Sequence, residues 1–549
     1  MHILSPHSLF RETFYVSCRS YRMLHSARGL CKDAFCPLAS RVFLLASGGG
    51  WLFNQEQPGI VPVRWETVMP DDLHMDSEQF REFGRKLLDF IADYREKIET
   101  FPVLSQVKPG EIAAGLPLEP PVEGDSLDSI LQDIDRLVMP GLTHWQSPGF
   151  FGYYPANSSL PSVLAELLCA GLGVQGMSWV TSPACTELET RVLDWLAGIL
   201  GLPGSFSSSS SGGGGVIHGT ASEAVLAVMV AGRERTRFTG ETDGKELRAY
   251  CSNQAHSSVL KAASICGIGS QNLVQVGVRD DLSIDSAMLE AAIESDLAAG
   301  RVPFFICATV GTTSTCAMDS VAELGRIARK YELWLHVDAA YAGNACICPE
   351  FRTMIEGVEL ADSFNCNPHK WLLTTFDCST LWVRDRESFT RALSVTPEYL
   401  RTSQGDSGAV IDYRDWQIPL GRRFRSLKLW FVLRWYGVEG LRTFIREQVR
   451  LAELFEELVC GDQNFEICAP RRLGLVCFRF RGSDDENREL LDAINSGGEI
   501  FLTHAVIPAA GAGRYVLRFA TGTISTKEKH VLRAWAIIQS LAPPATSPG

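Results

Sequence analysis

The centre of the sequence alternates between short apolar runs and an amphipathic stretch. Residues 301–310 and 333–340 are apolar runs of strand length, and residues 321–332 between them have the spacing of an amphipathic helix. A strand, a helix and a second strand in this order form a crossover between parallel strands. Such units in series build a parallel sheet with helices on both faces. The alternation therefore predicts an α/β fold.

Different patterns flank this central region. Apolar residues recur every three or four positions between residues 80 and 98, which predicts an amphipathic helix. Beyond residue 430, apolar runs at 472–482 and 513–522 predict two strands, and residues 526–541 have helical spacing. We therefore expect a helical segment, a large domain and a small α+β domain, at residues 75–158, 159–428 and 429–549.

Residues 1–74 have a composition of their own. Up to residue 45 they hold six basic residues against Glu12 and Asp33, together with several serines. This composition is typical of an organelle targeting sequence, although the match is weak. We interpret residues 1–74 as a disordered or targeting-like extension and expect a cytoplasmic protein, with organelle targeting as the alternative.

The charge balance and the cysteine pattern argue against several classes of function. The formal net charge of −13 disfavours a nucleic-acid-binding protein, which normally carries a basic face, and adhesion to anionic membranes. The sequence holds no uninterrupted apolar run of membrane-spanning length. The sixteen cysteines are scattered through apolar segments without the spacing of a zinc site. We therefore expect reduced, buried thiols and no metal.

The segment SFNCNPHKWL, residues 363–372, carries the strongest chemical signal. Lys370 follows a short strand-like run and is flanked by Pro368, Trp371 and Leu372. Burial among apolar groups lowers the pKa of a lysine and makes its amine a nucleophile suited to a Schiff base. A surface lysine with a buried stem is the alternative.

Asp338 ends the apolar run of HVDAAYAG, residues 336–343. An unpaired carboxylate in such a place is costly, so Asp338 needs a cationic partner. A protonated pyridine nitrogen would serve, and Ala339 and Ala340 leave room for a flat ring. A strand-end cap or a partner for an arginine is the alternative.

Two further segments point to the same kind of ligand. Gly212–Gly215 run into a helix-forming stretch, and a glycine-rich turn before a helix can hold a phosphate; a flexible linker is the alternative. His256 follows another strand-like run, where its ring could stack on a flat cofactor or remain a solvated loop side chain. An amine, a carboxylate, an aromatic ring and a phosphate site at strand ends together predict pyridoxal 5′-phosphate.

Longer motifs resemble those of the aromatic-L-amino-acid decarboxylases, which are pyridoxal-phosphate group II decarboxylases. These motifs are THW (143–145), SPACTELE (182–189), QAHSS (254–258), HVDAAYAG (336–343), NPHKW (367–371) and WQIPLGRRFRSLKLW (416–430). The resemblance covers residues 75–541. It implies the aspartate-aminotransferase-like fold (fold type I) with a mixed, mostly parallel seven-stranded sheet. It also implies a homodimer with two active sites at its interface, across which the N-terminal helical segment packs.

The same resemblance implies a role for single residues. Lys370 would bind the cofactor covalently, Asp338 would pair with its ring nitrogen, and His256 would stack on its ring. The other residues that would contact the cofactor are Thr220, Ala221, Ser222, Thr312, Ala340, Asn367 and His369. The residues that would line the substrate pocket are Trp145, Tyr153, Pro155, Gln175, Met177 and Gly421.

Tyr399 lies in a polar segment, residues 394–408, whose proline and glycines suit a mobile lid. It matches the family's lid tyrosine, which returns a proton to the substrate after CO2 is lost. Related aldehyde synthases often replace this tyrosine or the stacking histidine, and both are present here. The resemblance therefore favours a decarboxylase over an aromatic acetaldehyde synthase. A catalytically silent scaffold homologue is the more distant alternative.

The choice of substrate is less constrained. Gly421 stands where some relatives carry serine, which leaves room for a bulky ring and favours L-DOPA, 5-hydroxytryptophan or tryptophan. An enzyme that prefers tyrosine or phenylalanine is the alternative. Gln175, Met177 and Ala156 replace the isoleucine, phenylalanine and threonine of the animal enzymes at positions thought to face the neighbouring subunit's ligand. The expected products are CO2 and the corresponding aromatic amine, a biogenic amine.

Overall fold

The computed structural model describes residues 74–238, 242, 244–395, 397–508 and 513–544. The chain divides into two compact units, Met1–Phe80 and Arg81–Gly549. Residues 1–73 are outside the described residues. The disordered or targeting-like extension expected there therefore stays a prediction. No helix in the described part of the chain is long and apolar enough to cross a membrane. The expected cytoplasmic location stays a prediction.

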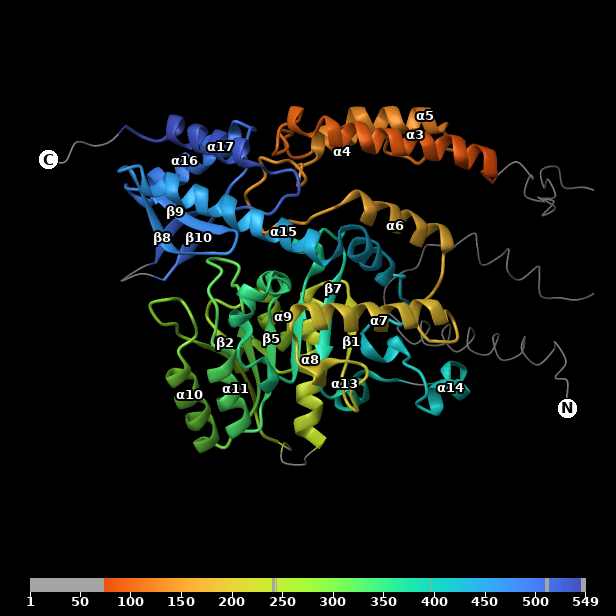
Figure 1. Cartoon of the computed structure of the whole chain (residues 1–549), viewed down its shortest axis with the longest axis vertical. Helices are drawn as coiled ribbons and strands as arrows, with labels where there is room; N and C mark the ends of the chain where they lie inside the picture. Colours follow the sequence, from red (N-terminus) through yellow and green to blue (C-terminus); the bar gives the residue numbers. More distant parts are fainter. Residues whose placement is uncertain (1–73, 239–241, 243, 396, 509–512, 545–549) are drawn as a thin grey trace, which may run out of the picture. The chain divides into compact units, whose positions relative to one another are not determined.

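A seven-stranded sheet runs through the second unit (Figure 1). Its strands are β1 (Gly214–His218), β2 (Leu247–Ser252), β3 (Leu273–Val276), β4 (Val302–Thr309), β5 (Trp334–Asp338), β6 (Ser363–Cys366) and β7 (Ser379–Val383). Their order across the sheet is β1-β7-β6-β5-β4-β2-β3. The pairs from β3 to β6 are parallel, whereas β7 is antiparallel to both β6 and β1. The predicted mixed, mostly parallel sheet is confirmed.

Helices cover both faces of this sheet. Successive residues of a strand point to opposite sides, so the apolar side chains on each face are buried by a separate set of helices. The helices are α7 (Pro183–Leu200), α8 (Ala221–Phe238), α9 (Ser257–Ile265), α10 (Ser286–Ala298), α11 (Val321–Lys330) and α13 (Arg386–Leu393). Phe305 and Cys307 of β4 share one buried cluster with α8, α9 and α13. Ile306 and Ala308 share another with α7, α10 and α11. Both sides of β4 are therefore buried, which explains its continuous apolar sequence.

Further elements precede and follow this sheet along the chain. Before it come α3 (Ser77–Glu96), η2 (Ile98–Thr100), α4 (Glu111–Gly115), α5 (Leu127–Asp133), η3 (Ile134–Val138) and α6 (Leu160–Leu172). After it come α15 (Ser426–Cys460), β8 (Phe465–Arg472), β9 (Leu475–Phe480), α16 (Asp484–Ser496), β10 (Thr503–Ile507), β11 (Arg514–Ala520) and α17 (Glu528–Leu541). The last four strands form an antiparallel sheet in the order β10-β11-β9-β8. Helix α15 runs through the expected boundary at residue 428, and the domain limits stay a prediction.

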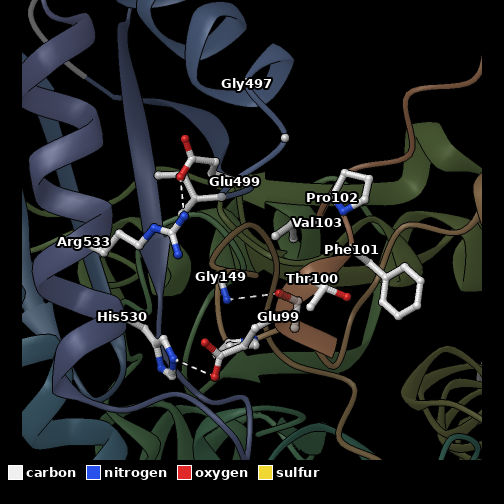
Figure 2. A pocket seen from close by; sticks show the side chains of 14 residues that line it. Glu99, Thr100, Phe101, Pro102, Val103, Gly149, Gly497, Glu499, His530 and Arg533 are labelled. Carbon is white, nitrogen blue, oxygen red and sulfur yellow. Dashed lines mark hydrogen bonds and ion pairs between the residues drawn. The ribbon is translucent and has the colours of Figure 1, made fainter. Parts of the chain in front are cut away.

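A cavity of about 270 Å³ lies between the segment that follows α3 and the C-terminal helix α17 (Figure 2). On one side of it, His530 Nε2 lies 3.3 Å from a carboxylate oxygen of Glu99. On another, Arg533 binds the Glu499 carboxylate at 2.6 Å. The Glu99 contact connects η2, the short helix that follows α3, to the C-terminal helix α17.

A buried ion pair joins α7, β1 and the loop before α15. The side chains of Glu189 and Arg422 are both 0% exposed, and Arg422 Nη2 lies 2.8 Å from Glu189 Oε1. The same carboxylate oxygen accepts the Ile217 N–H at 2.8 Å, and Arg422 donates to the Ile217 carbonyl at 2.8 Å. The pair therefore holds the end of β1, which leads directly into the turn before α8.

We predict that Arg422→Met destabilises the protein, because Glu189 would then carry a buried charge without its partner. Removing one member of a buried ion pair costs about 3–5 kcal/mol. The double variant Glu189→Met/Arg422→Met should recover a large part of this loss, since no buried charge remains. Urea unfolding midpoints of both variants measure these effects. An Arg422→Met midpoint equal to that of the wild type would contradict the prediction.

Candidate active site

A cavity of about 210 Å³ at the carboxyl ends of the strands brings most of the predicted cofactor residues together. They come from the turn before α8, from the start of α9, and from the segments after β5 and β6. The predicted residues that line it are Thr220, Ala221, Ser222, His256, Asp338, Ala340, Asn367, His369 and Lys370. These segments converge because β1, β2, β5 and β6 all end at the same edge of the sheet.

Lys370 lies in a short helix, α12 (Pro368–Trp371), immediately after β6. Burial lowers the pKa of Lys370, the Asp338 carboxylate raises it, and the Arg518 guanidinium lowers it. Burial dominates, so the amine is shifted toward its neutral, nucleophilic form. Its Nζ lies 5.8 Å from the centre of the Tyr154 ring. These surroundings favour a reactive amine over a surface lysine.

Asp338 ends β5 and is 5% exposed. Its Oδ1 accepts hydrogen bonds from the Ala340 N–H at 3.1 Å and from Asn365 Nδ2 at 3.3 Å. No hydrogen bond from another described residue reaches Oδ2. This oxygen can therefore accept a hydrogen bond from a protonated ring nitrogen in the cavity.

Two neutral histidines line the same cavity. His256 begins α9, and its Nδ1 accepts the Ser258 N–H at 3.2 Å. His369 Nδ1 accepts the Cys378 N–H at 2.9 Å. Burial lowers the pKa of both imidazoles, to about 3 for His369. Both rings can thus contact a flat cofactor at neutral pH without adding a positive charge.

The interpretation of Gly212–Gly215 as the phosphate-binding turn is wrong. Gly214 and Gly215 belong to β1, and a Cβ on Gly215 would lie 2.7 Å from the Trp382 ring. The glycines are therefore needed for close packing within the sheet. The turn that opens α8 lies further along, at Gly219 and Thr220. The first N–H groups of α8 have no partner within the helix and attract an anion.

Thr312, predicted to flank the ring, lies just behind the cavity wall. It is 1% exposed, and its hydroxyl accepts the Ala317 N–H at 3.0 Å. Its neighbours Gly311 and Thr313 line the cavity instead. Gly311 has a φ of +91°, and a Cβ there would lie 2.7 Å from Ala342. The contact of Thr312 with the cofactor stays a prediction.

Tyr399 and the predicted substrate residues do not line this cavity. Trp145 and Tyr153 stack with ring centres 5.5 Å apart and are 37% and 48% exposed. Gln175 and Gly421 are neighbours, since a Cβ on Gly421 would lie 3.4 Å from Gln175 Oε1. Tyr399 is 79% exposed. Pro155 lies close to Gly522, and the Met177 carbonyl accepts a hydrogen bond from the Arg414 N–H. Their roles stay predictions.

Several residues at this site were not selected from the sequence, among them Tyr154, Arg518 and Asn157. Tyr154 lines the cavity and stacks on Tyr341 with ring centres 3.6 Å apart. Arg518 Cζ of β11 lies 5.4 Å from the Tyr154 ring. Asn157 Nδ2 donates to the Lys370 carbonyl at 2.8 Å. A charged residue within an apolar strand was a usable signal for Arg518. No local pattern marks Tyr154 or Asn157, because the fold brings them to the lysine.

Comparison with known proteins agrees with this geometry. Residues 109–481 match the family model for the pyridoxal-dependent decarboxylase conserved domain. Phenylacetaldehyde synthase of Arabidopsis thaliana is 53% identical over 478 residues, which cover 85% of this chain and 96% of that protein. Tyrosine decarboxylase 2 of Narcissus pseudonarcissus is 50% identical over 479 residues, covering 85% and 95%. The crystal structure of Oryza sativa TDC with PLP and tryptamine has a TM-score of 0.83 at 42% identity, covering 85% of this chain and 98% of that one.

We predict that buried His369 makes the protein sensitive to acid. Its pKa in the folded protein is about 3, whereas an exposed histidine has a pKa near 6.5. Between these values only the unfolded chain binds the proton, so the free energy of unfolding falls as pH falls, by about 1.4 kcal/mol per pH unit. His369→Gln should reduce that slope by this amount. Urea unfolding at several pH values from 6.5 to 5 measures it, and an unchanged slope would refute the prediction.

Proposed function

This chain belongs to the pyridoxal-dependent decarboxylases, carboxy-lyases that use pyridoxal 5′-phosphate, and we propose that it converts aromatic L-amino acids to aromatic amines and CO2. One observation carries the proposal: Lys370, Asp338 and His256 line the same buried cavity. The retention of Tyr399 favours the release of an amine. L-DOPA, 5-hydroxytryptophan and tryptophan are the proposed substrates.

The cavity residues fit the cofactor of the family. The unpaired Oδ2 of Asp338 suits a ring N–H, the open start of α8 suits a phosphate, and the small side chain of Ala340 leaves space for a ring. When bound, the cofactor supplies an aldehyde that reacts with amines and a ring that withdraws electrons. Lys370 would hold it through its amine, and the N–H groups at Ala221 and Ser222 would hold its phosphate.

The chain's own residues then act on the substrate by binding and proton transfer. Asp338 would keep a proton on the ring nitrogen, which stabilises the charge that develops when CO2 leaves. His256 would hold the ring in place from one side. Tyr399 would return a proton to the substrate Cα, which completes the amine.

We propose a homodimer because apolar side chains on the N-terminal helices are left exposed. In α6, Leu164 and Leu168 are 49% and 43% exposed. In α3, Leu87 and Leu88 are 40% and 42% exposed. Apolar surface gathered on helices in this way is typical of a protein–protein interface, and a second copy of the chain would cover it.

In this dimer, the segment with Tyr399 would serve the partner's cavity. Just beyond this segment, the chain is joined by two hydrogen bonds to the segment that carries Gln175 and Met177. Trp179 N–H donates to Asp412 Oδ1 at 2.8 Å, and Arg414 N–H donates to the Met177 carbonyl at 2.8 Å. Neither segment lines its own subunit's cavity. Because the two segments are joined to each other and lie away from their own subunit's cavity, we propose that both contribute to the cavity of the partner subunit.

An aromatic acetaldehyde synthase is the second candidate, because a relative of that activity is 53% identical. Overall identity does not separate the two activities, since a tyrosine decarboxylase is 50% identical. The presence of Tyr399 and His256 supports the decarboxylase.

We predict that Tyr399→Phe converts amine formation into aldehyde formation. Without the phenol, amine release should fall at least about a hundredfold, the usual contribution of a general acid. Dissolved O2 should then be consumed together with water, and aldehyde, ammonia and hydrogen peroxide should appear. Tyr331→Phe deletes a hydroxyl on the partly buried residue that follows α11, outside the cavity lining. It is the matched control and should change neither product. Unchanged amine formation in Tyr399→Phe would exclude the proposed proton donor.

We predict that two variants that each fail to form amine complement each other in mixed dimers. Lys370→Ala lacks the amine, and Tyr399→Phe lacks the proton donor. If the sites are shared, half of the dimers in an equal mixture contain one complete site, and the mixture should form amine at about a quarter of the wild-type rate. No recovery beyond the sum of the separate variants would show that Tyr399 serves its own subunit.

We predict that Gly421→Ser weakens the use of tryptophan relative to tyrosine. The added side chain would fill space beside Gln175 Oε1, and steric exclusion of one group in a pocket changes kcat/KM by about tenfold or more. Ratios of kcat/KM for the two substrates measure the effect. An unchanged ratio would mean that residue 421 does not face the substrate ring.

A further inference from the structure

A row of buried polar side chains lies behind Asp338, along the seam between β5 and β6. Trp334, His336 and Asp338 alternate along β5 and so share one face, and Ser363 and Asn365 are the register partners of His336 and Asp338 on β6. Trp334, His336, Ser363 and Asn365 are all 0% exposed. Buried polar groups are costly unless they are hydrogen-bonded, so each of these side chains needs its partner.

The row begins at an indole. Trp334 Nε1, which can only donate, lies 2.9 Å from Ser363 Oγ. Ser363 Oγ also lies 2.9 Å from His336 Nδ1. Because the serine oxygen already accepts from the indole, its own hydrogen is available for the imidazole nitrogen.

The row ends at the carboxylate. Asn365 Nδ2 donates to Asp338 Oδ1 at 3.3 Å, and since a carboxylate only accepts, this contact fixes the orientation of the amide. Asn365 Oδ1 is then left as an acceptor. It and His336 Nε2 are both buried and have no hydrogen-bond partner among the described residues, so each is available to the other.

The state of His336 follows from these contacts. Burial lowers the pKa of His336 to about 4, although the Asp338 carboxylate and the Asn365 amide raise it. The ring is therefore neutral and carries one hydrogen. A hydrogen on Nε2 lets it donate to Asn365 Oδ1, whereas a hydrogen on Nδ1 would leave two acceptors facing each other.

We propose that Trp334, Ser363, His336 and Asn365 are positioning residues that form a one-directional relay of hydrogen bonds ending on Asp338. The indole donates to the hydroxyl, the hydroxyl to the imidazole, the imidazole to the amide and the amide to the carboxylate. Aligned donors of this kind strengthen one another in a buried place. The relay stabilises the negative charge of Asp338 and leaves its Oδ2 directed to the cofactor's ring nitrogen.

The test compares two cofactors that differ only at the ring nitrogen. The dissociation constants of the full-length protein are measured for pyridoxal 5′-phosphate and for 1-deazapyridoxal 5′-phosphate, in which carbon replaces that nitrogen. Their ratio isolates the interaction with Asp338. We expect His336→Leu and Asn365→Ala to reduce the preference for the natural cofactor about tenfold, the size of one hydrogen bond to a charged group. His336→Gln keeps a donor toward Asn365 and should stay within about threefold of the wild type.

Val337→Ala is the matched control. Val337 lies between His336 and Asp338 on β5, is also 0% exposed, and belongs to the cluster on the opposite face. It should weaken the binding of both cofactors equally and leave the ratio unchanged.

Proportional loss of both affinities in His336→Leu, or in Asn365→Ala, would overturn the relay and leave these residues with a purely structural role. If His336→Leu fails to fold, the milder Asn365→Ala decides, because it removes the direct donor to Asp338. The inference depends on the cofactor of the family and not on the proposed substrate. A wrong substrate would leave the ratio unaffected, so the two failures are distinguishable.

Discussion

The structure depends on holding the amine of Lys370 where its charge is poorly stabilised. Burial lowers the pKa of this lysine. Two charged side chains also act on it: Asp338 favours the charged form of the amine, and Arg518 opposes it. Neighbouring side chains hold the lysine in this position: Asn157 donates a hydrogen bond to its carbonyl, and the Tyr154 ring lies near its amine. The sheet provides the place itself, because the ends of its parallel strands converge on one edge. A buried, nucleophilic amine beside a carboxylate is the chemical basis of the family's reaction.

The sequence predicted those features that depend on local patterns. The strands at residues 301–310 and 333–340 are apolar because both of their faces are buried, and Asp338, the polar residue that ends the second strand, lines the cavity. The phosphate-binding turn predicted at residues 212–215 was wrong, since glycine is compatible both with a turn and with a strand that packs closely. Arg518 and Tyr154 reach the site from distant parts of the chain, so no local pattern could connect them to Lys370. The relay behind Asp338 likewise needs the register of β5 against β6.

The division of the site between a buried cavity and an exposed surface has a functional meaning in the proposed dimer. The groups proposed to hold the cofactor come from the ends of the central strands. Tyr399, Trp145 and Gln175 lie elsewhere on the subunit, where a second copy can receive them. Relatives of similar identity include an aldehyde synthase and a tyrosine decarboxylase. In the proposed dimer, changes at these outer residues would alter the reaction outcome or the substrate without changing the cavity.

The central claim is that this chain removes CO2 from an aromatic amino acid without consuming oxygen. Simultaneous measurement of CO2 release and dissolved oxygen, with L-DOPA, 5-hydroxytryptophan or tryptophan as substrate, tests it most directly. We predict one amine for each CO2 and a constant oxygen concentration. Oxygen uptake that matches CO2 release, with an aldehyde in place of the amine, would contradict this account and identify the protein as an aldehyde synthase.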